Sequence, residues 1–511
     1  MLLFAQPGTG TRAACGEGEV EMAGWRLGAG TEYLRRRWSS PAGYREVLVL
    51  AGPLVLSTGT STVQQFVNRV FLSWYSPEAL AASLPAGALS FTVLCFFIGT
   101  ASYANTFVAQ YHGARQPERI AGAVWQAIRL SVAAAFIVMP FALAAKPVFD
   151  LAGHPLAVRQ LECDYFRILI LGGGFTVLSA AVSAFFTGIG QTRTVMWVSV
   201  SSTVLNALLD YGLIFGHWGL PRLGIVGAAY ATVIAQGLGS VAFLALFLFG
   251  AQSREYNVWR TRGFDRPLFV RLLRFGAPSG LHFMLDVLAW SLFILLIGRL
   301  GITALGATNL AFQVNSIVFV PMIGFAIATS TLVGQRLGQD RPDLAARTTW
   351  SAFHITFTYM TTLAAFYLLA PSLFLLPFGA KADPAQFALL RDTTIIMLRF
   401  VAVYSVFDSA NLIFSAALKG AGDTLFVMLM SSSLSMSLMV VPTWFICRDG
   451  KGSIWAAWTA LTVFIVVLAF FFLGRFLKGK WRTMRVTESP HSPPYPTYPN
   501  PDLPVTHTEV P

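Results

Sequence analysis

Three aspartates stand inside long apolar stretches of the sequence, and two of them have neighbours that could help to bind a cation. Asp408 lies in the run VAVYSVFDSAN, four residues after Tyr404, and Asp286 lies in GLHFMLDVLAWS. If these runs span a bilayer, each buried carboxylate costs roughly 2.5–3.5 kcal/mol, so its retention needs a function. Residues four apart share a helix face, which places Tyr404 beside Asp408. Two carboxylates among neutral oxygen and amide groups suit Na⁺ or a shared proton.

Polar residues at helical spacing extend this pattern. Asn309 and Gln313 are four residues apart and share a face with Ser316, whereas Asn206 and Asp210 are four apart in an earlier stretch. We therefore expect one cation-coupling group made by Asp286, Tyr404, Asp408, Asn309 and Gln313, with Asp286 and Asp408 as candidate Na⁺ ligands. Asn206 and Asp210 begin a second group. The alternative is that these side chains only hydrogen-bond to neighbouring helices, as amides often do in membranes.

The composition restricts the class of protein. Of 511 residues, 55% are hydrophobic and only 12% are charged. Soluble domains carry about 25% charged residues, so the sequence predicts an all-α polytopic membrane protein. The net charge of +12 comes from short basic loops between apolar runs, which indicates cytoplasmic loops and not a nucleic-acid partner. The four cysteines are scattered without metal-ligand or disulfide spacing, and we expect no cofactor.

Twelve apolar runs are long enough for a spanning helix, which needs about 20 residues. The runs are 46–72, 83–108, 122–146, 164–187, 193–216, 225–250, 273–299, 308–333, 349–375, 394–417, 425–446 and 453–477. Alternate loops contain most of the basic residues, among them YHGARQPERI, GQRLGQDRP and RFLKGKWRTMR. The positive-inside rule places these loops and both termini in the cytoplasm, and the chain in the inner (plasma) membrane.

The sequence contains an internal repeat. GTASYANTFVAQYHGARQP begins at Gly99 and matches GFAIATSTLVGQRLGQDRP, which begins at Gly324, an offset of 225 residues between 99 and 324. The same offset pairs Thr106 with Thr331, Val108 with Val333, Gln110 with Gln335, Gly113 with Gly338, Pro117 with Pro342 and Pro53 with Pro278. A second match, of FFTGIGQT with AALKGAGDT, pairs Gly188 and Gly190 with Gly420 and Gly422 at an offset of 232. Six helices in each unit predict parallel repeats that enter the membrane from the same side.

The repeat predicts a division into two lobes. We expect an N-terminal segment (1–42), an N-lobe (43–250), a basic cytoplasmic linker (251–272), a C-lobe (273–478) and a disordered Pro-rich tail (479–511). A long basic loop that joins two six-helix bundles favours a two-lobe transporter. An ancient duplication in a receptor or channel is the alternative.

Several segments together resemble the multidrug and toxic compound extrusion (MATE) family. They are FVNRVFLSWYSPEALAA, VAQYHGARQPE, LNALLDYGLIFG, VGQRLGQDRPD and ALKGAGDT, and the resemblance covers roughly residues 43 to 478. It implies a V-shaped, two-lobe antiporter that exports organic cations and other amphiphiles by alternating access, driven by a Na⁺ or H⁺ gradient. We expect a monomer whose partners are the lipid bilayer and a small-molecule substrate.

The resemblance also assigns roles in the C-lobe. NorM-like members carry a carboxylate in the seventh helix, usually Glu, where this chain has Asp286. They carry a Tyr and an Asp at the positions of Tyr404 and Asp408. Asp is one methylene shorter than Glu, which changes the reach of this ligand.

In the N-lobe, DinF-like members use an Asn and an Asp at the positions of Asn206 and Asp210. They add an Asp at the end of the first helix, where this chain has Asn68. An amide can ligate a cation but cannot take up a proton, so this chain departs from the family there. Thr232, in the sixth helix, is a further residue of this N-lobe group.

Proline marks a mechanical element in both halves. Pro53 and Pro278 hold equivalent places near the start of the first helix of each half. Proline inside a helix removes a backbone hydrogen bond and can kink it, so we expect these two residues to act as hinges.

Two other functions compete with antiport. A lipid-linked precursor flippase of the same superfamily would need several cationic side chains in its cavity to hold pyrophosphate, and we expect no Arg or Lys at the middle of the spanning runs. A membrane enzyme would need a catalytic motif, and the sequence contains no HExxH, GxSxG or P-loop. We therefore predict that the protein is not an enzyme.

Overall fold

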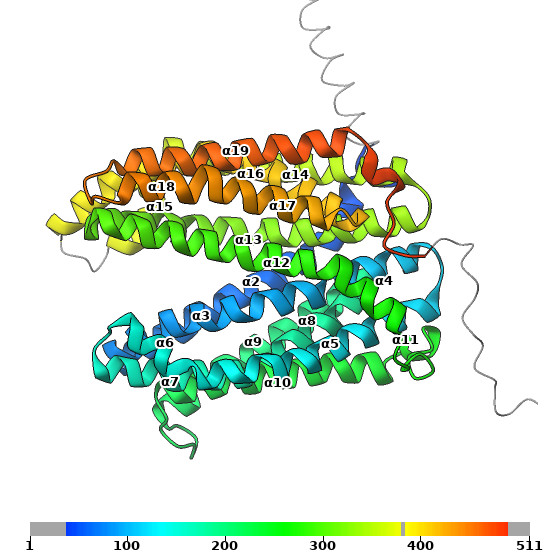
Figure 1. Ribbon diagram of the computed structural model, residues 1–511, viewed down its shortest axis with the longest axis horizontal. Coiled ribbons are helices and arrows are strands. Elements are labelled where there is room, and N and C mark those ends of the chain that lie inside the picture. The colour runs from blue at the N-terminus through cyan, green and yellow to red at the C-terminus, as the bar shows by residue number, and fades with distance from the viewer. Residues whose placement is uncertain (1–36, 380–383, 489–511) are drawn as a thin grey trace, which may run out of the picture.

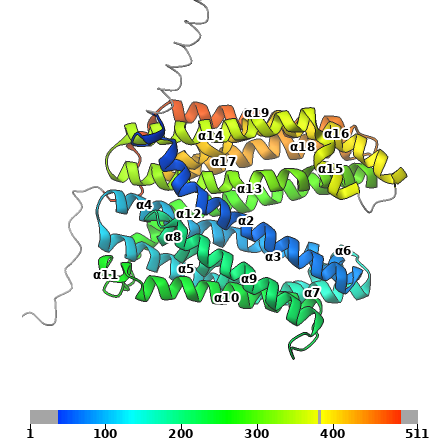
Figure 2. The same cartoon turned by 180° about the vertical axis from the view of Figure 1, so that it is seen from behind.

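The computed structural model describes residues 37–379 and 384–488, and within this part of the chain the regular secondary structure is helical, without a β-strand. Among the described residues, twelve helices are long and apolar enough to cross a membrane, which confirms the all-α polytopic prediction. They lie in two layers, one for each lobe, as Figures 1 and 2 show from opposite sides.

The bounds of the helices follow the expected runs, and most helices are longer. The N-lobe contains α2 (Tyr44–Tyr75), α3 (Pro77–Ser102), α4 (Ala104–Gly113), α5 (Pro117–Leu143), α6 (Ala145–Ala152), α7 (Leu156–Leu171), α8 (Gly173–Gly188), α9 (Thr192–Phe215) and α10 (Ile225–Phe249). The short α11 (Gln252–Glu255) follows in the linker. The C-lobe contains α12 (Arg266–Ile297), α13 (Ile302–Gly338), α14 (Pro342–Leu369), α15 (Pro371–Gly379), α16 (Pro384–Ala421), α17 (Thr424–Leu434), a π-helical segment (Ser435–Val440), α18 (Val441–Cys447) and α19 (Ile454–Leu477).

Local sequence signals explain where these helices start. Ser76 caps α3 by accepting a hydrogen bond from the backbone N–H of Ala79 at 3.0 Å, and Pro77 takes the first helical position. Asp265 caps α12 in the same way, through the N–H of Leu268 at 3.1 Å. Because of this cap, α12 begins at Arg266, earlier than the expected start at residue 273, and the linker is correspondingly shorter.

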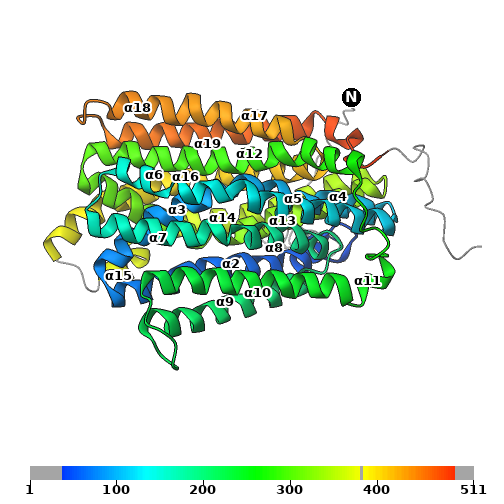
Figure 3. The same cartoon turned by 60° about the horizontal axis from the view of Figure 1, so that its bottom comes forward.

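The loops with most of the arginines gather at one end of the helices, which we call the Arg-rich end. Figures 1 and 3 show α4 and α11 at this end, whereas α6 and α15 lie at the opposite end. The inter-lobe hydrogen bonds and ring contacts of the described residues lie between the Arg-rich end and the middle of the helices. The deepest of them are the Thr58–Val320 bond and the Phe91–Phe283 contact.

The first helix of each lobe packs on the second helix of the other lobe, and glycine permits both crossings. A Cβ on Gly99 of α3 would lie 2.8 Å from the Cα of Gly280 of α12. A Cβ on Gly324 of α13 would lie 2.7 Å from the backbone nitrogen of Val55 of α2. Both pairs obey the repeat offset of 225, so the two crossings are equivalent. Small residues at such crossings let membrane helices approach closely.

A buried polar pair lies at the same interface. Nδ2 of Asn105 donates to Oγ1 of Thr331 at 2.9 Å, and Oγ1 of Thr331 lies 3.2 Å from Oδ1 of Asn105. Asn105 comes from α4 of the N-lobe and Thr331 from α13 of the C-lobe. The contact therefore joins the lobes in an environment where an unmet polar group is costly.

The prediction of a disordered C-terminal tail is wrong for its first ten residues, 479–488. Lys480–Thr483 form a 3₁₀ helix, and Trp481 is buried against Phe476 of α19. The chain then continues to Glu488 across the Arg-rich end. The composition was misleading here because proline becomes frequent only after Ser489, and residues 489–511 lie outside the described part of the chain.

Candidate functional site

Three of the residues expected to couple a cation lie on two helices of the C-lobe, α12 and α16. Tyr404 is buried, and Asp408 lies one turn further along α16. Asp286 lies on α12, near enough for its charge to act on Asp408. The amide of Asn411 lies on the same stretch of α16 and donates to Oδ1 of Asp408 at 3.4 Å. The C-lobe group thus consists of two carboxylates on different helices, a phenol and an amide.

Asn315 is a C-lobe residue that the sequence analysis missed. Its Nδ2 donates to the hydroxyl of Tyr404 at 3.3 Å, and its Oδ1 is buried without a hydrogen-bond partner. The expected amides, Asn309 and Gln313, are exposed on another face of α13 together with Ser316. The structure therefore does not place them beside Tyr404. Helical spacing could not single out Asn315. Asn309, Gln313 and Asn315 all lie within two turns of one helix, and spacing alone does not tell which face points inward.

Lys419 is a second residue that was missed, because it lies beyond the expected end of its helix. Its Nζ lies 3.4 Å from Nδ1 of His282, one turn before Asp286 on α12, and its charge attracts Asp286. The backbone carbonyl of the same lysine accepts a hydrogen bond from the hydroxyl of Tyr103 in the N-lobe at 2.8 Å. Lys419 thus lies at the lobe interface and also beside His282, one turn from Asp286.

The N-lobe holds its own buried carboxylate. Asn206 and Asp210 on α9 are both fully buried. In the amide orientation that satisfies both polar atoms of Asn206, its nitrogen donates to Oδ2 of Asp210 at 3.1 Å. Its oxygen then accepts from the backbone N–H of Thr232 at 3.2 Å. The Thr232 hydroxyl bonds to the carbonyl of Ala228 within its own helix, so Thr232 contributes through its backbone.

Tyr165 connects Asn68 to this N-lobe group. Nδ2 of Asn68 lies 3.5 Å from the Tyr165 hydroxyl, and the charge of Asp210 acts on the same phenol. Oδ1 of Asn68 and Oδ1 of Asp210 are both buried without a hydrogen-bond partner in the described residues. Tyr165 carried no usable sequence signal, since a single tyrosine near a helix end is common.

Unpartnered oxygens are therefore present at both groups. Asn68, Asp210 and Asn315 each leave one buried side-chain oxygen without a donor. Buried polar atoms are normally hydrogen-bonded, so such atoms need an explanation, and an absent ion is one. Within the described residues no three His, Cys, Asp or Glu side chains gather to hold a metal ion. A cation at either group would thus be ligated mainly by neutral oxygens, as Na⁺ can be.

One expectation about cationic residues is wrong. Arg129 lies in the middle of α5, and its guanidinium donates to the carbonyl of Arg262 and to Oε1 of Gln126, the latter at 3.3 Å. The linker folds back along α5 and reaches this side chain. Arg129 therefore faces the linker and not a central cavity.

Two lobes built from parallel repeats, each with a buried polar group inside a spanning bundle, define a polytopic membrane transporter and not an enzyme. The chain belongs to the MatE family, whose model matches residues 53–212 and 278–445. This confirms the resemblance seen in the sequence.

Named relatives agree with this assignment, and a solved structure shares the fold. The chain is 27% identical to the probable multidrug resistance protein NorM of Burkholderia pseudomallei, over 84% of this chain and 91% of that protein. It is 31% identical to the probable multidrug resistance protein YoeA of Bacillus subtilis, over 60% of this chain and 67% of that protein. The fold is similar to that of a MOP superfamily transporter from Pyrococcus furiosus, with a TM-score of 0.76 and 20% identity, over 88% of this chain and 98% of that one.

Proposed function

We propose that the protein is a secondary antiporter that exports amphiphilic, often cationic, drugs or toxic compounds in exchange for Na⁺ or H⁺. Family membership and the names of the relatives support multidrug export. The observation that supports ion coupling is a set of three buried oxygens without donors. One belongs to the carboxylate of Asp210, and the other two belong to Asn68 and Asn315, whose amide nitrogens lie beside Tyr165 and Tyr404. A bound cation satisfies these oxygens, and its release leaves them unmet.

The proposed orientation places the Arg-rich end in the cytoplasm and the chain in the inner (plasma) membrane, with both termini cytoplasmic. The positive-inside rule supports this orientation. Because the inter-lobe contacts lie on that half of the molecule, the structure corresponds to a state that is closed toward the cytoplasm. Both lobes belong to one chain, so the alternating interface needs no second copy, and a monomer suffices.

The substrate route is proposed to run along the exposed polar faces of α2 and α13, which pack on each other across the lobes. Ser61 and Gln65 on α2 are exposed, as are Asn309 and Gln313 on α13. Exposed polar side chains deep in a bilayer are costly against lipid, so they belong on a water-filled route. In this role Asn309 and Gln313 contact substrate or water, whereas Asp286, Tyr404 and Asp408 hold the coupling ion.

Coupling follows from differential binding of the ion to two states. A cation shifts the equilibrium between states only by the difference in its affinity for them. The carbonyl of Lys419 takes part in the closed interface through Tyr103, while the Lys419 ammonium acts on Asp286. A cation that neutralises Asp286 therefore changes the environment of one residue that joins the two lobes.

The flippase alternative rests on Lys419. This lysine is a cation near the interior of the C-lobe, but it is a single one and interacts with His282 and Asp286. A pyrophosphate group needs several positive donors, usually including arginine. Export of cationic amphiphiles therefore fits the carboxylate-containing interior better.

Reconstituted vesicles provide the test. Ethidium uptake into vesicles with an imposed Na⁺ gradient, and separately with an imposed H⁺ gradient, should show substrate movement with one ion or with both. Movement of a fluorescent lipid-linked pyrophosphate with no ethidium transport would support the flippase. Ethidium transport that ignores both gradients would contradict ion coupling.

A further inference from the structure

The chain returns to the lobe interface after its last spanning helix. Trp481 anchors the return by stacking on Phe476, with ring centroids 4.9 Å apart. Residues 484–488, which we name the C-terminal strap, then cross the Arg-rich end and finish at Glu488. The strap belongs to neither bundle and contacts both lobes.

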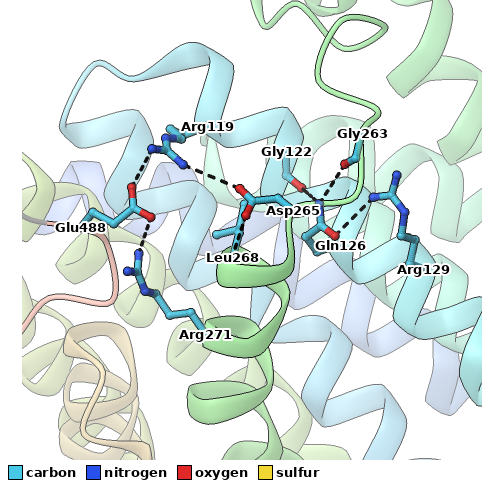
Figure 4. A network of polar contacts seen from close by, with 9 residues as sticks. All are labelled: Arg119, Gly122, Gln126, Arg129, Gly263, Asp265, Leu268, Arg271 and Glu488. Atoms are coloured by element: carbon cyan, nitrogen blue, oxygen red, sulfur yellow. Dashed lines mark hydrogen bonds and ion pairs between the residues drawn. The ribbon is translucent and has the colours of Figure 1, made fainter. Parts of the chain in front are cut away.

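Glu488 bridges the two lobes through its carboxylate. Its Oε2 lies 2.8 Å from Nη2 of Arg119, at the start of α5 in the N-lobe. Its Oε1 lies 2.9 Å from Nη1 of Arg271, near the start of α12 in the C-lobe (Figure 4). The Glu488 side chain is only 18% exposed, and the Arg119 side chain 20%. Partly buried ion pairs in a network contribute more than exposed ones.

Neighbouring charges hold this bridge in place. Arg119 also lies 3.8 Å from Oδ2 of Asp265, the residue that caps α12 (Figure 4). Arg119 therefore interacts with Asp265 and with Glu488 of the strap at the same time. Arg485 pairs with Asp340 at 3.0 Å, but the Asp340 side chain is 82% exposed, so this pair contributes little.

Val486 joins the strap to the closed interface itself. Its side chain is buried, and its backbone N–H donates to Oε1 of Gln110 at 2.9 Å. Nε2 of the same glutamine donates to the carbonyl of Gly420 at 2.9 Å. One amide thus links the N-lobe, the C-lobe and the strap.

The strap packs on the lobes through two apolar side chains, Met484 and Val486. A cavity of about 490 Å³ lies between the strap and the first turns of α12, lined in part by Pro267, Arg274 and Phe275. Only Val486 among the strap residues is buried. The strap is therefore held by its polar contacts together with Met484 and Val486, and water can replace the polar contacts when they open.

We propose that the C-terminal strap is a latch that holds the Arg-rich ends of the two lobes together and detaches when the transporter opens on that side. Arg119 and Arg271 belong to different lobes, so Glu488 cannot keep both partners once the lobes separate. The Gln110–Gly420 bond breaks in the same movement, which removes half of the support of Val486. The latch biases the resting population toward the state closed at the Arg-rich end. This inference rests on the proposed function, since alternating access supplies the opening.

A distance measurement tests the latch without any transport step. Spin labels at Glu118→Cys and Asp343→Cys, two exposed positions on opposite lobes, report the separation at the Arg-rich end once the four native cysteines are replaced by alanine. We expect one short distance in the wild-type background in nanodiscs. Glu488→Gln should raise the ratio of long to short distances by about fivefold, because it removes the charge shared by two arginines.

Matched variants separate the strap from other causes. Glu255→Gln changes an exposed acid in α11 and should leave the distribution unchanged. A chain that ends at Glu488 keeps the strap and should give the wild-type distance distribution. A chain that ends at Thr483 keeps Trp481 but loses the strap, and its ratio of long to short distances should rise further. Identical distributions in the wild type, Glu488→Gln and the chain ending at Thr483 would overturn the latch. Ethidium efflux by the unlabelled wild type reports on the proposed function separately, so the two failures are distinguishable.

Discussion

Nε2 of Gln335 donates a hydrogen bond to the carbonyl oxygen of Gly188 at 2.8 Å, and this bond runs from the C-lobe to the N-lobe. The repeat equivalents, Gln110 and Gly420, form the same bond in the opposite direction at 2.9 Å. The two motifs that reveal the duplication in the sequence are thus the two that meet across the lobes. Each glutamine satisfies a carbonyl near a helix end, where no intrahelical donor remains.

The closed interface should not tolerate a methyl group at Gly338. A Cβ there would lie 2.0 Å from the carbonyl oxygen of Gln110. We expect Gly338→Ala to destabilise the closed state by about 1–3 kcal/mol, as overpacking does, and to lower the melting temperature of the purified protein. Gly474→Ala on α19 is the control, because its Cβ would meet nothing within 4 Å. Equal melting temperatures for Gly338→Ala and the wild type would refute the prediction.

The C-lobe carboxylates should be needed for coupling and not for folding. We expect Asp408→Asn and Asp286→Asn each to reduce gradient-driven ethidium transport at least tenfold, because an amide cannot supply the negative charge that holds the ion. Asp392→Asn, an exposed position on the same helix as Asp408, should have no effect. Full gradient-driven transport by both variants would remove the C-lobe from the coupling mechanism.

The N-lobe should change its ion preference when a second carboxylate is added. Asn68→Asp replaces an amide whose oxygen has no donor with a group that can take up a proton near Asp210. We expect transport to depend more steeply on the H⁺ gradient, since two nearby carboxylates share a proton readily. Initial rates measured across a series of imposed pH gradients at constant Na⁺ check this. An unchanged pH profile would show that residue 68 does not reach the ion.

Lys419 should oppose cation binding at Asp286. The lysine charge already attracts this carboxylate, so a cation has to compete with it. Lys419→Met should lower the ion concentration for half-maximal transport by about three- to tenfold, equivalent to roughly 1 kcal/mol because a tenfold change corresponds to about 1.4 kcal/mol. Lys419→Arg keeps the charge and should resemble the wild type. A loss of transport in Lys419→Met together with a loss of anionic-lipid binding would instead favour the flippase.

Pro53 should matter for movement, because its position near the α2–α13 crossing lets a bend in α2 separate the lobes. Pro53→Ala restores a backbone donor inside α2, and we expect slower ion-coupled transport at unchanged substrate affinity. Pro278 occupies the equivalent place in α12 but lies between Gly276 and Gly280, which both pack closely against α3. We therefore expect Pro278→Ala to have the smaller effect. Equal rates for Pro53→Ala and the wild type would argue against a hinge there.

Much of the fold was readable from the sequence, since long apolar runs in a bilayer can only be helices. All twelve spans were found, and Gly99 and Gly324 marked the repeat. The starts of the helices were harder to predict from the sequence. In α12, for example, the capping residue Asp265 extends the helix beyond the apolar run. The strap was not predicted, because the sequence MRVTE contains no signal for an ordered structure. Its position is fixed by tertiary contacts with Gln110, Arg119 and Arg271.

The sequence by itself determined the class, the two lobes and the aspartates that need a function, because burial in lipid makes each charge costly and therefore informative. Tertiary structure decided which neutral groups join those aspartates. Asn315 bonds to Tyr404 where Gln313 does not, and Tyr165 reaches Asn68 from a helix far away in the chain. The physical reason is that helical spacing fixes which residues share a face, whereas the packing of helices fixes where that face points.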